Sequence, residues 1–317
     1  MTKVVGAARR INWAGQAPLI TLLVLCIVTS LLTSRFLSPI NLTNIFVQSS
    51  IMAVIAVGMT FVIIGGGFDL SVGSTVALSG CIAAMAMLKF GIFAGVVSGI
   101  AAGAAVGLAN GLIVAALKVN PFIATLGSMV LVRGVVYIIT GGAPVSGDDG
   151  LPGAFVAFGN ARLFGIHYLV WVPLVLLIVL TVVMQLTPYG RRVYATGGNR
   201  EAAYLSGVAV ERVIASTYVW CGALAGVAGV MLAARLQSGQ PTAGEFYELT
   251  AIAAVVLGGA SLYGGEGTLY KSVIGVFIMI VLGNGLNLLN VDSYWQRVAV
   301  GAVVIAAAAA DRLRSRA

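Results

Sequence analysis

Charged residues are scarce in this chain. Only 9% of its 317 residues are Asp, Glu, Lys or Arg, whereas 60% are hydrophobic. Ordinary soluble domains contain about 25% charged residues. A soluble core is unable to hide so much apolar surface, because a globule keeps a large polar area in contact with water. The composition therefore excludes an ordinary soluble domain and predicts a membrane protein.

Cysteine and histidine are also rare. Cys26, Cys81 and Cys221 each lie in an apolar run and show no paired spacing, so a disulfide framework is not expected. The single histidine, His167, cannot build a histidine-rich metal site. The sequence contains no zinc-protease helix motif and no convincing nucleophile elbow. We therefore expect no catalytic residues, no metal and no directly bound cofactor.

Basic residues exceed acidic ones, which gives a formal charge of +8. They lie between apolar runs and at the two ends, instead of gathering in one soluble segment. This is the distribution of membrane-topology signals, so no nucleic-acid partner is expected.

The apolar runs predict an all-α polytopic protein. A span needs about 20 apolar residues, and ten segments qualify: 18–34, 44–64, 70–88, 91–117, 122–140, 168–187, 213–234, 249–263, 271–290 and 295–310. The segment 249–263 is short for a full span, and eight or nine spans is the alternative. No small-x-small cleavage site follows the first run, so we interpret it as an uncleaved span instead of a signal peptide.

The positive-inside rule sets the predicted orientation. With the N-terminus in the cytoplasm, the inner segments contain Lys3, Arg9, Arg10, Lys118, Arg191, Arg192, Arg200, Arg212, Lys271, Arg312, Arg314 and Arg316. The outer segments contain only Arg35, Lys89, Arg162, Arg235 and Arg297. Both termini are therefore predicted to be cytoplasmic. Segment 141–167 is then an outer loop, and the polar, basic segment 188–212 is a cytoplasmic loop long enough for a short helix along the membrane.

Glycine marks one predicted helix seam. Six glycines recur every fourth residue along the fourth span: Gly91, Gly95, Gly99, Gly103, Gly107 and Gly111. Such a stripe lets a neighbouring backbone approach closely. We expect a tight helix–helix seam, with a smooth face against a moving neighbour as the alternative.

Two glycine-rich interruptions with a carboxylate suggest broken helices. They lie at 65–74, with Asp69, and at 239–249, with Glu248. They occupy corresponding positions in two five-span halves of opposite orientation, 18–140 and 168–310, within a single membrane domain. Inverted repeats of transporters place broken helices in this way. Each carboxylate either caps the following helix or belongs to a translocation path. Arg133, inside a span, is expected to pair with a carboxylate or to extend toward the membrane surface.

A second glycine-rich run, 258–268, leads into Lys271-Ser272 and resembles a phosphate-binding loop. Tyr270 stands where that motif requires glycine, and no strand–helix unit surrounds it. We interpret the run as a tight turn. Any ATP-driven process therefore needs a partner ATPase.

The cytoplasmic loop carries a recognisable motif. Glu201-Ala202-Ala203 followed by Gly207 resembles the "EAA" loop of ABC import permeases. Nearby Gly190-Arg191 and Gly197-Gly198-Asn199 are similar to the ribose/xylose/arabinose-type sugar permeases in particular. Further similar segments are 66–74, 120–127, 241–259, 284–289 and 294–296, so the resemblance covers roughly 36–310. The Ile-x-Leu-Pro of the wider EAA pattern is absent, since Ser216-Thr217-Tyr218-Val219 stands there.

The resemblance implies a permease subunit in the bacterial inner membrane. Its implied partners are cytoplasmic ABC ATPase subunits, a periplasmic sugar-binding protein and a second permease, either identical or related. The residues implied to couple it to the ATPase are Glu201, Ala202, Ala203, Gly207, Arg191 and Arg200, although the arginines also fit a simple role as topology signals. Candidates for the translocation path are Asp69, Asn120, Phe122, Thr125, Glu248, Asn284, Asn287, Tyr294 and Trp295, each of which also fits packing or capping.

Other functions remain open from the sequence. A similar permease for a nucleoside or a branched-chain amino acid is the first alternative. An ion-coupled secondary transporter and a membrane scaffold without transport are the others.

Overall fold

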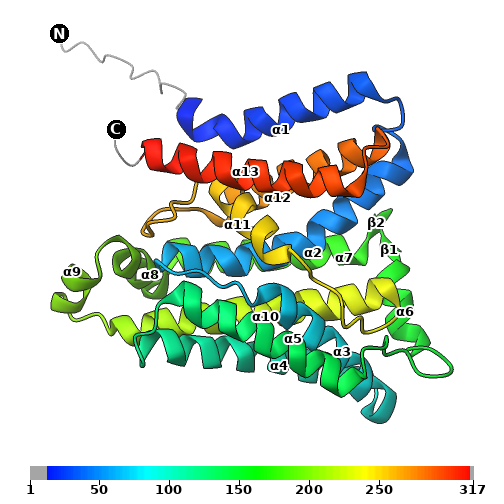
Figure 1. Cartoon of the computed structure of the whole chain (residues 1–317), viewed down its shortest axis with the longest axis horizontal. Helices are drawn as coiled ribbons and strands as arrows, with labels where there is room; N and C mark the ends of the chain where they lie inside the picture. The colour runs from blue at the N-terminus through cyan, green and yellow to red at the C-terminus, as the bar shows by residue number, and fades with distance from the viewer. Residues whose placement is uncertain (1–12, 315–317) are drawn as a thin grey trace, which may run out of the picture.

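The computed structural model describes residues 13–314, and this part of the chain is helical apart from loops and one small hairpin. Long helices run side by side in a bundle (Figure 1). Seven of them are long and apolar enough to cross a membrane: α2 (Pro39–Ile64), α3 (Val72–Phe90), α4 (Ile92–Ala115), α5 (Pro121–Thr140), α7 (Tyr168–Leu186), α10 (Val210–Leu236) and α12 (Leu269–Leu288). The prediction of an all-α, multi-pass membrane protein is confirmed.

Three further predicted spans coincide with helices that contain shorter apolar stretches. These helices are α1 (Trp13–Leu32), α11 (Tyr247–Leu257) and α13 (Ser293–Arg314). Every predicted span thus corresponds to a helix, while the count of ten crossings and the direction of the termini stay predictions. Lys3, Arg9, Arg10 and Arg316, which entered the orientation argument, lie outside the described residues.

Proline preceded by a capping side chain starts three helices. Ser38, Asn120 and Thr187 each accept a hydrogen bond from a backbone N–H of the first turn of α2, α5 and α8 (Pro188–Gly198), and proline follows each of them. Proline suits the first helical position because its missing N–H would have no partner there. These local signals fix where the helices begin.

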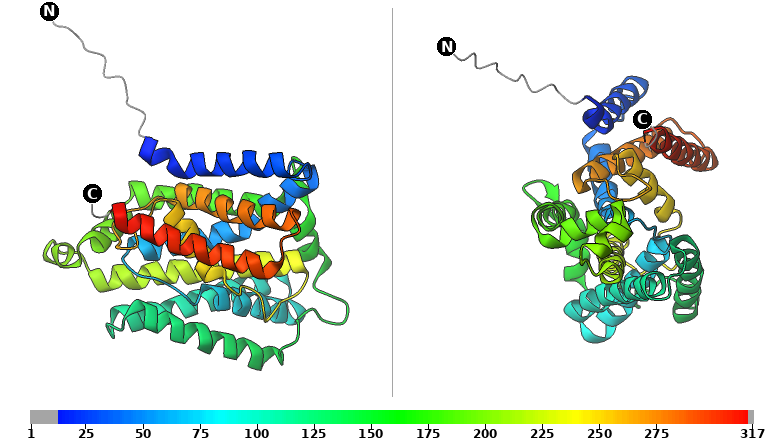
Figure 2. Two further views of the ribbon diagram at one scale, coloured as in Figure 1. Left: turned by 45° about the horizontal axis from the view of Figure 1, so that its top comes forward. Right: turned by 90° about the vertical axis from the view of Figure 1, so that its left-hand side faces the viewer.

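The helix α10 forms the centre of the bundle. It lies against α2, α3 and α4, although α5, segment 141–167 and α7 separate it from them in the sequence. The apolar stretch of α2 is itself 94% buried inside the protein. The proposed halves therefore interlock in one core and do not form separate units (Figure 2).

The glycine seam along α4 is confirmed for five of its six residues. A Cβ atom added at Gly95 or Gly99 would collide with α3, and one at Gly103, Gly107 or Gly111 would collide with the backbone of α10. Gly91 is the exception. It precedes α4, and a Cβ there would have no neighbour within 4 Å. Close backbone approach is thus the reason for the stripe.

Helix neighbours recur in the same pattern in the two halves. The pairs α3–α4 and α3–α5 correspond to α11–α12 and α11–α13. The pairs that join the halves also match, since α4 and α3 lie against α10, as α12 and α11 lie against α2.

The connecting segments contain more structure than the sequence predicted. Segment 141–167 includes the helix α6 (Gly153–Asn160) and a hairpin of β1 (Arg162–Leu163) and β2 (Ile166–His167). Segment 188–212 contains two helices, α8 and α9 (Arg200–Leu205), at one end of the bundle (Figure 1). The predicted span 249–263 is wrong at its end, because α11 stops at Leu257 and the glycines after it form an irregular loop.

Candidate functional site

The two interruptions predicted from the sequence meet inside the protein. Residues 65–71 separate α2 from α3, and residues 237–246 separate α10 from α11. The backbones of Gly73 and Gly244 touch, so that a Cβ on either one would collide with the carbonyl group of the other. Gly244 also has φ +75°, a conformation that favours glycine. The N-terminal ends of α3 and α11 therefore lie together.

A hydrogen-bonded network fixes the first interruption. Asp69 is 1% exposed, and its Oδ1 accepts bonds from the Ser71 N–H at 2.9 Å and the Ser71 hydroxyl at 2.6 Å. The Asn110 amide on α4 donates to the Ser71 Oγ at 2.8 Å, and the Tyr218 hydroxyl on α10 donates to the Phe68 carbonyl at 3.0 Å. Asp69 thus orders the turn just before α3, because its backbone partner is the N–H of the N-cap residue Ser71 and not one of the first helical turn.

Arg133 fixes the second interruption. Its Nη1 donates to the carbonyl oxygens of Pro241 at 2.6 Å and Ala243 at 2.8 Å. The hydrogen bonds of Arg133 thus go to backbone carbonyl groups, because irregular backbone inside a bundle offers unpaired carbonyl groups that need a donor. Its expected pairing with a carboxylate stays a prediction, and Glu245 and Glu248 line a cavity together with Arg133. Glu248 lies in the first turn of α11 beside Gly73, where its Oε2 would be 2.5 Å from an added Cβ.

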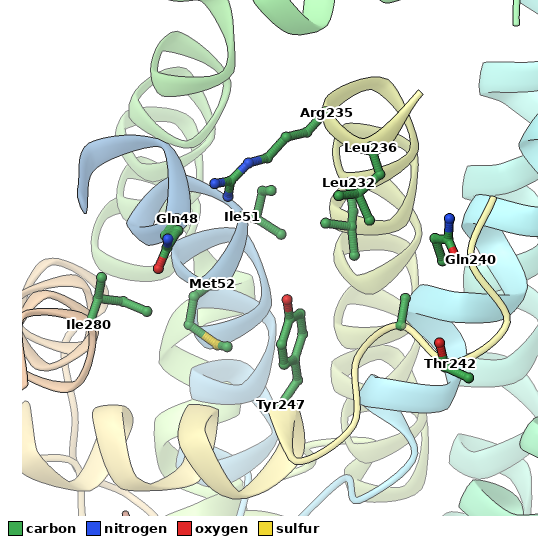
Figure 3. Close-up of a pocket in the computed structure, with 11 residues that line it drawn as sticks. Gln48, Ile51, Met52, Leu232, Arg235, Leu236, Gln240, Thr242, Tyr247 and Ile280 are labelled. Carbon is green, nitrogen blue, oxygen red and sulfur yellow. The ribbon is translucent and has the colours of Figure 1, made fainter. Parts of the chain in front are cut away.

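A cavity opens next to the second interruption. It has a volume of about 570 Å³ and lies between α2, α10, α12 and segment 240–247. It is lined by Gln48, Ile51, Met52, Leu232, Arg235, Leu236, Gln240, Thr242, Ala243, Tyr247 and Ile280 (Figure 3). The sequence analysis missed these residues, although Gln48 in an apolar helix and Arg235 at a helix end were signals that could have found the polar ones.

Helices α8 and α9 contact the loops at the ends of α2 and α11. Arg200 donates from Nη2 to the Gly66 carbonyl at 3.1 Å, and the Tyr194 hydroxyl donates to the Gly267 carbonyl at 2.8 Å. The Gly265 N–H completes the junction by donating to the Ile64 carbonyl at 2.9 Å. Burial raises the pKa of the Tyr194 phenol, so it remains a donor at neutral pH.

These glycines also pack directly on one another. A Cβ on Gly197 of α8 would collide with the Ile64 carbonyl, and one on Gly264 would lie 2.9 Å from the Gly66 Cα. The end of α8 therefore packs by backbone contact on the loop after α2, which is the first interruption, and on the loop after α11.

The family model described as "Branched-chain amino acid transport system / permease component" matches residues 41–308. The chain belongs to this permease family.

Relatives of this permease confirm the resemblance noted from its motifs. The ribose import permease protein RbsC of Bacillus subtilis is 45% identical over 97% of each chain. The L-arabinose transport system permease protein AraH of Escherichia coli is 38% identical, over 96% of this chain and 92% of its own. The D-allose transport system permease protein AlsC of Escherichia coli is 39% identical, over 93% and 90%. No solved structure shows a significant match to the permease.

The residues expected to couple this permease to an ATPase lie on both faces of α8 and α9. Arg191, Glu201 and Ala202 are exposed, whereas Ala203 is buried in the chain's own core. Gly207 ends α9 with φ +81°. Tyr204 and Leu205 are 64% and 79% exposed, and the sequence analysis did not name them as coupling residues. Large apolar side chains on a loop of this kind are typical of a protein interface.

The other path candidates lie apart from the cavity beside α11. Asn120 accepts a bond from the Phe122 N–H at 2.9 Å, Thr125 donates to the Pro121 carbonyl, and Phe122 is exposed. Asn284 exchanges two amide hydrogen bonds with Asn41, of 3.0 and 2.7 Å, which join α12 to α2. Asn287, Tyr294 and Trp295 are exposed. Glu248 is the candidate that lies where the two interruptions meet, beside Gly73, while Asp69 lies four residues before Gly73 in the network with Ser71 and Asn110.

Proposed function

We propose that this permease forms the membrane path of an ATP-driven, binding-protein-dependent importer of monosaccharides. Its relatives named for ribose, arabinose and allose support the substrate class. The observation that carries the mechanism is the junction in which Arg200 of α9 bonds to Gly66 beside the first interruption, while Tyr194 of α8 bonds to Gly267 beyond α11.

In this proposal α8 and α9 face the cytoplasm of a bacterium, and a partner ATPase binds them. The permease crosses the inner membrane ten times, with both termini in the cytoplasm. Exposed Tyr204 and Leu205 anchor the ATPase, and Glu201 lies beside them on a cavity of about 630 Å³ that Lys118, Asn120 and Glu211 also line. Exposed charges at the rim of that cavity suit charge-assisted bonds to a partner.

ATP binding and release in the partner then shift two permease subunits between inward- and outward-facing states. The permease itself supplies no covalent chemistry and no ATP site. Matching neighbour pairs in the two halves support an inverted repeat, in which the interruptions that meet at Gly73 and Gly244 are equivalent. Transporters of this design place the solute where the broken helices meet. A periplasmic binding protein delivers the sugar.

Reconstitution tests the proposal. The permease is placed in liposomes with its ATPase and binding protein, and accumulation of D-ribose is measured with ATP inside, without ATP, and with an ion gradient alone. Accumulation only with ATP is expected. Accumulation driven by the ion gradient alone contradicts the proposal and identifies a secondary transporter.

A second candidate substrate is a branched-chain amino acid, because the matching family model carries that description. The same liposomes test it by competition. Excess leucine is expected to leave D-ribose accumulation unchanged, whereas ATP-dependent uptake of leucine and none of ribose would establish the second candidate.

A further inference from the structure

The cavity between α2 and α10 has the size of a small-molecule site. Its volume of about 570 Å³ lies within the range of about 300–1,000 Å³ for ligand pockets. It adjoins the second interruption, which contributes Thr242 and Ala243 to its wall. Arg133 donates hydrogen bonds to the carbonyl groups of Pro241 and Ala243 and so positions this part of the wall.

Polar side chains without a hydrogen-bond partner among the described residues point into the cavity. Figure 3 shows the guanidinium of Arg235 extending from α10 toward Gln48 on α2, and the hydroxyl of Tyr247 pointing into the space between these helices. Within the described residues, no protein group forms a hydrogen bond with the side chain of Arg235, Tyr247 or Gln48. Both Arg235 and Tyr247 are half-buried. A ligand that forms hydrogen bonds with them therefore gains more binding free energy than a ligand that bonds to fully exposed side chains.

The composition of the wall suits a neutral polyhydroxyl compound. Arg235, Gln48, Gln240 and Thr242 offer hydrogen-bond donors, and the described lining of the cavity contains no carboxylate. The planar fork of an arginine reaches two adjacent hydroxyl oxygens at once. Ile51, Met52 and Leu232, with the ring of Tyr247, offer an apolar surface for the C–H face of a sugar ring.

We propose that this cavity is a solute subsite that binds a neutral monosaccharide, with Arg235 and Tyr247 donating hydrogen bonds to adjacent hydroxyl groups. The inference rests on the proposed function and names a place on the path for its substrate. It assigns specificity to Arg235, which lies outside the motifs by which the chain resembles sugar permeases, together with Tyr247, which lies inside one of them.

Two conservative variants test the subsite in the reconstituted complex. Arg235→Gln removes the charged fork and keeps an amide donor, and Tyr247→Phe removes only one hydroxyl. D-ribose transported per ATP hydrolysed is expected to fall about tenfold for Arg235→Gln and about threefold for Tyr247→Phe, because a charge-assisted hydrogen bond contributes more than a neutral one.

Matched controls lie outside the cavity. Arg162→Gln alters an exposed arginine of β1, and Tyr137→Phe alters a half-exposed tyrosine of α5. Both are expected to retain the wild-type ratio. Wild-type ratios in Arg235→Gln and Tyr247→Phe as well would overturn the subsite.

Cysteine protection provides a readout that does not require transport. Thr242→Cys, in a chain in which Cys26 is replaced and Cys81 and Cys221 are buried, is labelled with a maleimide in the presence of D-ribose, D-ribose 5-phosphate or neither. Slower labelling with D-ribose supports the subsite even if reconstituted transport fails, which separates the two hypotheses. Protection by the phosphate ester alone, or by neither compound, overturns the assignment to a neutral sugar.

Discussion

Gly73 and Gly244 touch through their backbones where the two broken helices begin, and neither position has room for a Cβ atom. One glycine opens α3 and the other precedes α11, so the contact joins the two halves of the permease. The path proposed above depends on this contact, because it is where the two broken segments meet.

Adding one methyl group at this contact should therefore disrupt the permease. Gly73→Ala is expected to lower the free energy of unfolding by about 1–3 kcal/mol, the usual effect of overpacking. Gly244→Ala should add about 1–2 kcal/mol of backbone strain at its positive φ. Thermal unfolding of the purified protein measures both. Gly283→Ala is the control, since a Cβ there meets nothing within 4 Å, and an equal effect of all three variants would refute the argument.

Arg133 should hold the second interruption through its two hydrogen bonds to Pro241 and Ala243. Arg133→Met leaves both carbonyl groups without a donor and is expected to destabilise the protein by about 2 kcal/mol. Arg133→Lys should restore part of that loss, because an ammonium group keeps the charge without the planar fork. Hydrogen exchange at residues 239–246 reports the change. Unaltered protection of this segment in Arg133→Met would show that other contacts position it.

The amide pair of Asn41 and Asn284 should behave as a unit. Asn284→Leu leaves the Oδ1 of the buried Asn41 amide without its donor, while the Asn41 Nδ2 keeps its bond to the Phe36 carbonyl, and the expected loss is about 1–3 kcal/mol. The double variant Asn41→Leu, Asn284→Leu should cost less than the sum of the two single variants, because both amides are removed and only the Phe36 carbonyl loses its donor. Thermal unfolding of the two single variants and the double variant measures the coupling. Simple addition of the two single effects would show that the pair does not act together.

The tip of α9 should carry the ATPase interface. Leu205→Glu places a charge on an exposed apolar side chain, so it should not unfold the permease but should weaken its complex with the ATPase at least about tenfold. Co-purification and ATP-driven uptake both measure this loss. Leu163→Glu, on β1 of the outer segment, is the matched control. Full complex formation with Leu205→Glu would remove α9 from the proposed interface.

Local sequence signals predicted the helices because each depends on neighbouring residues. The apolar runs and the four-residue glycine repeat of α4 specify helices and a seam without knowledge of the rest of the chain. The capped prolines at Pro39, Pro121 and Pro188 are equally local signals that the sequence analysis did not use, so the predicted span 44–64 begins later than α2 does. The end of α11 was predicted too late because the apolar pattern continues beyond Leu257, whereas the backbone has to leave the helix to reach Gly197 and Gly66.

The sites were harder to predict because they depend on long-range contacts. Asp69 and Glu248 were expected as equivalents from a short motif, and the structure brings their segments together. The partners of Arg133 are carbonyl oxygens more than a hundred residues away, which carry no side-chain signal. The same reason hid the cavity of Arg235 and Tyr247, whose wall is assembled from four separate parts of the chain.

The central claim is that α8 and α9 form the cytoplasmic surface to which a soluble ATPase binds in order to move the broken helices. Labelling with a membrane-impermeant maleimide tests it most directly, using Tyr204→Cys and, at the other end of the bundle, Ser146→Cys, in right-side-out and inside-out vesicles. The account predicts that Tyr204→Cys is labelled only in inside-out vesicles and Ser146→Cys only in right-side-out ones. Labelling of Tyr204→Cys in right-side-out vesicles would place α9 beyond the reach of any cytoplasmic ATPase and contradict the account.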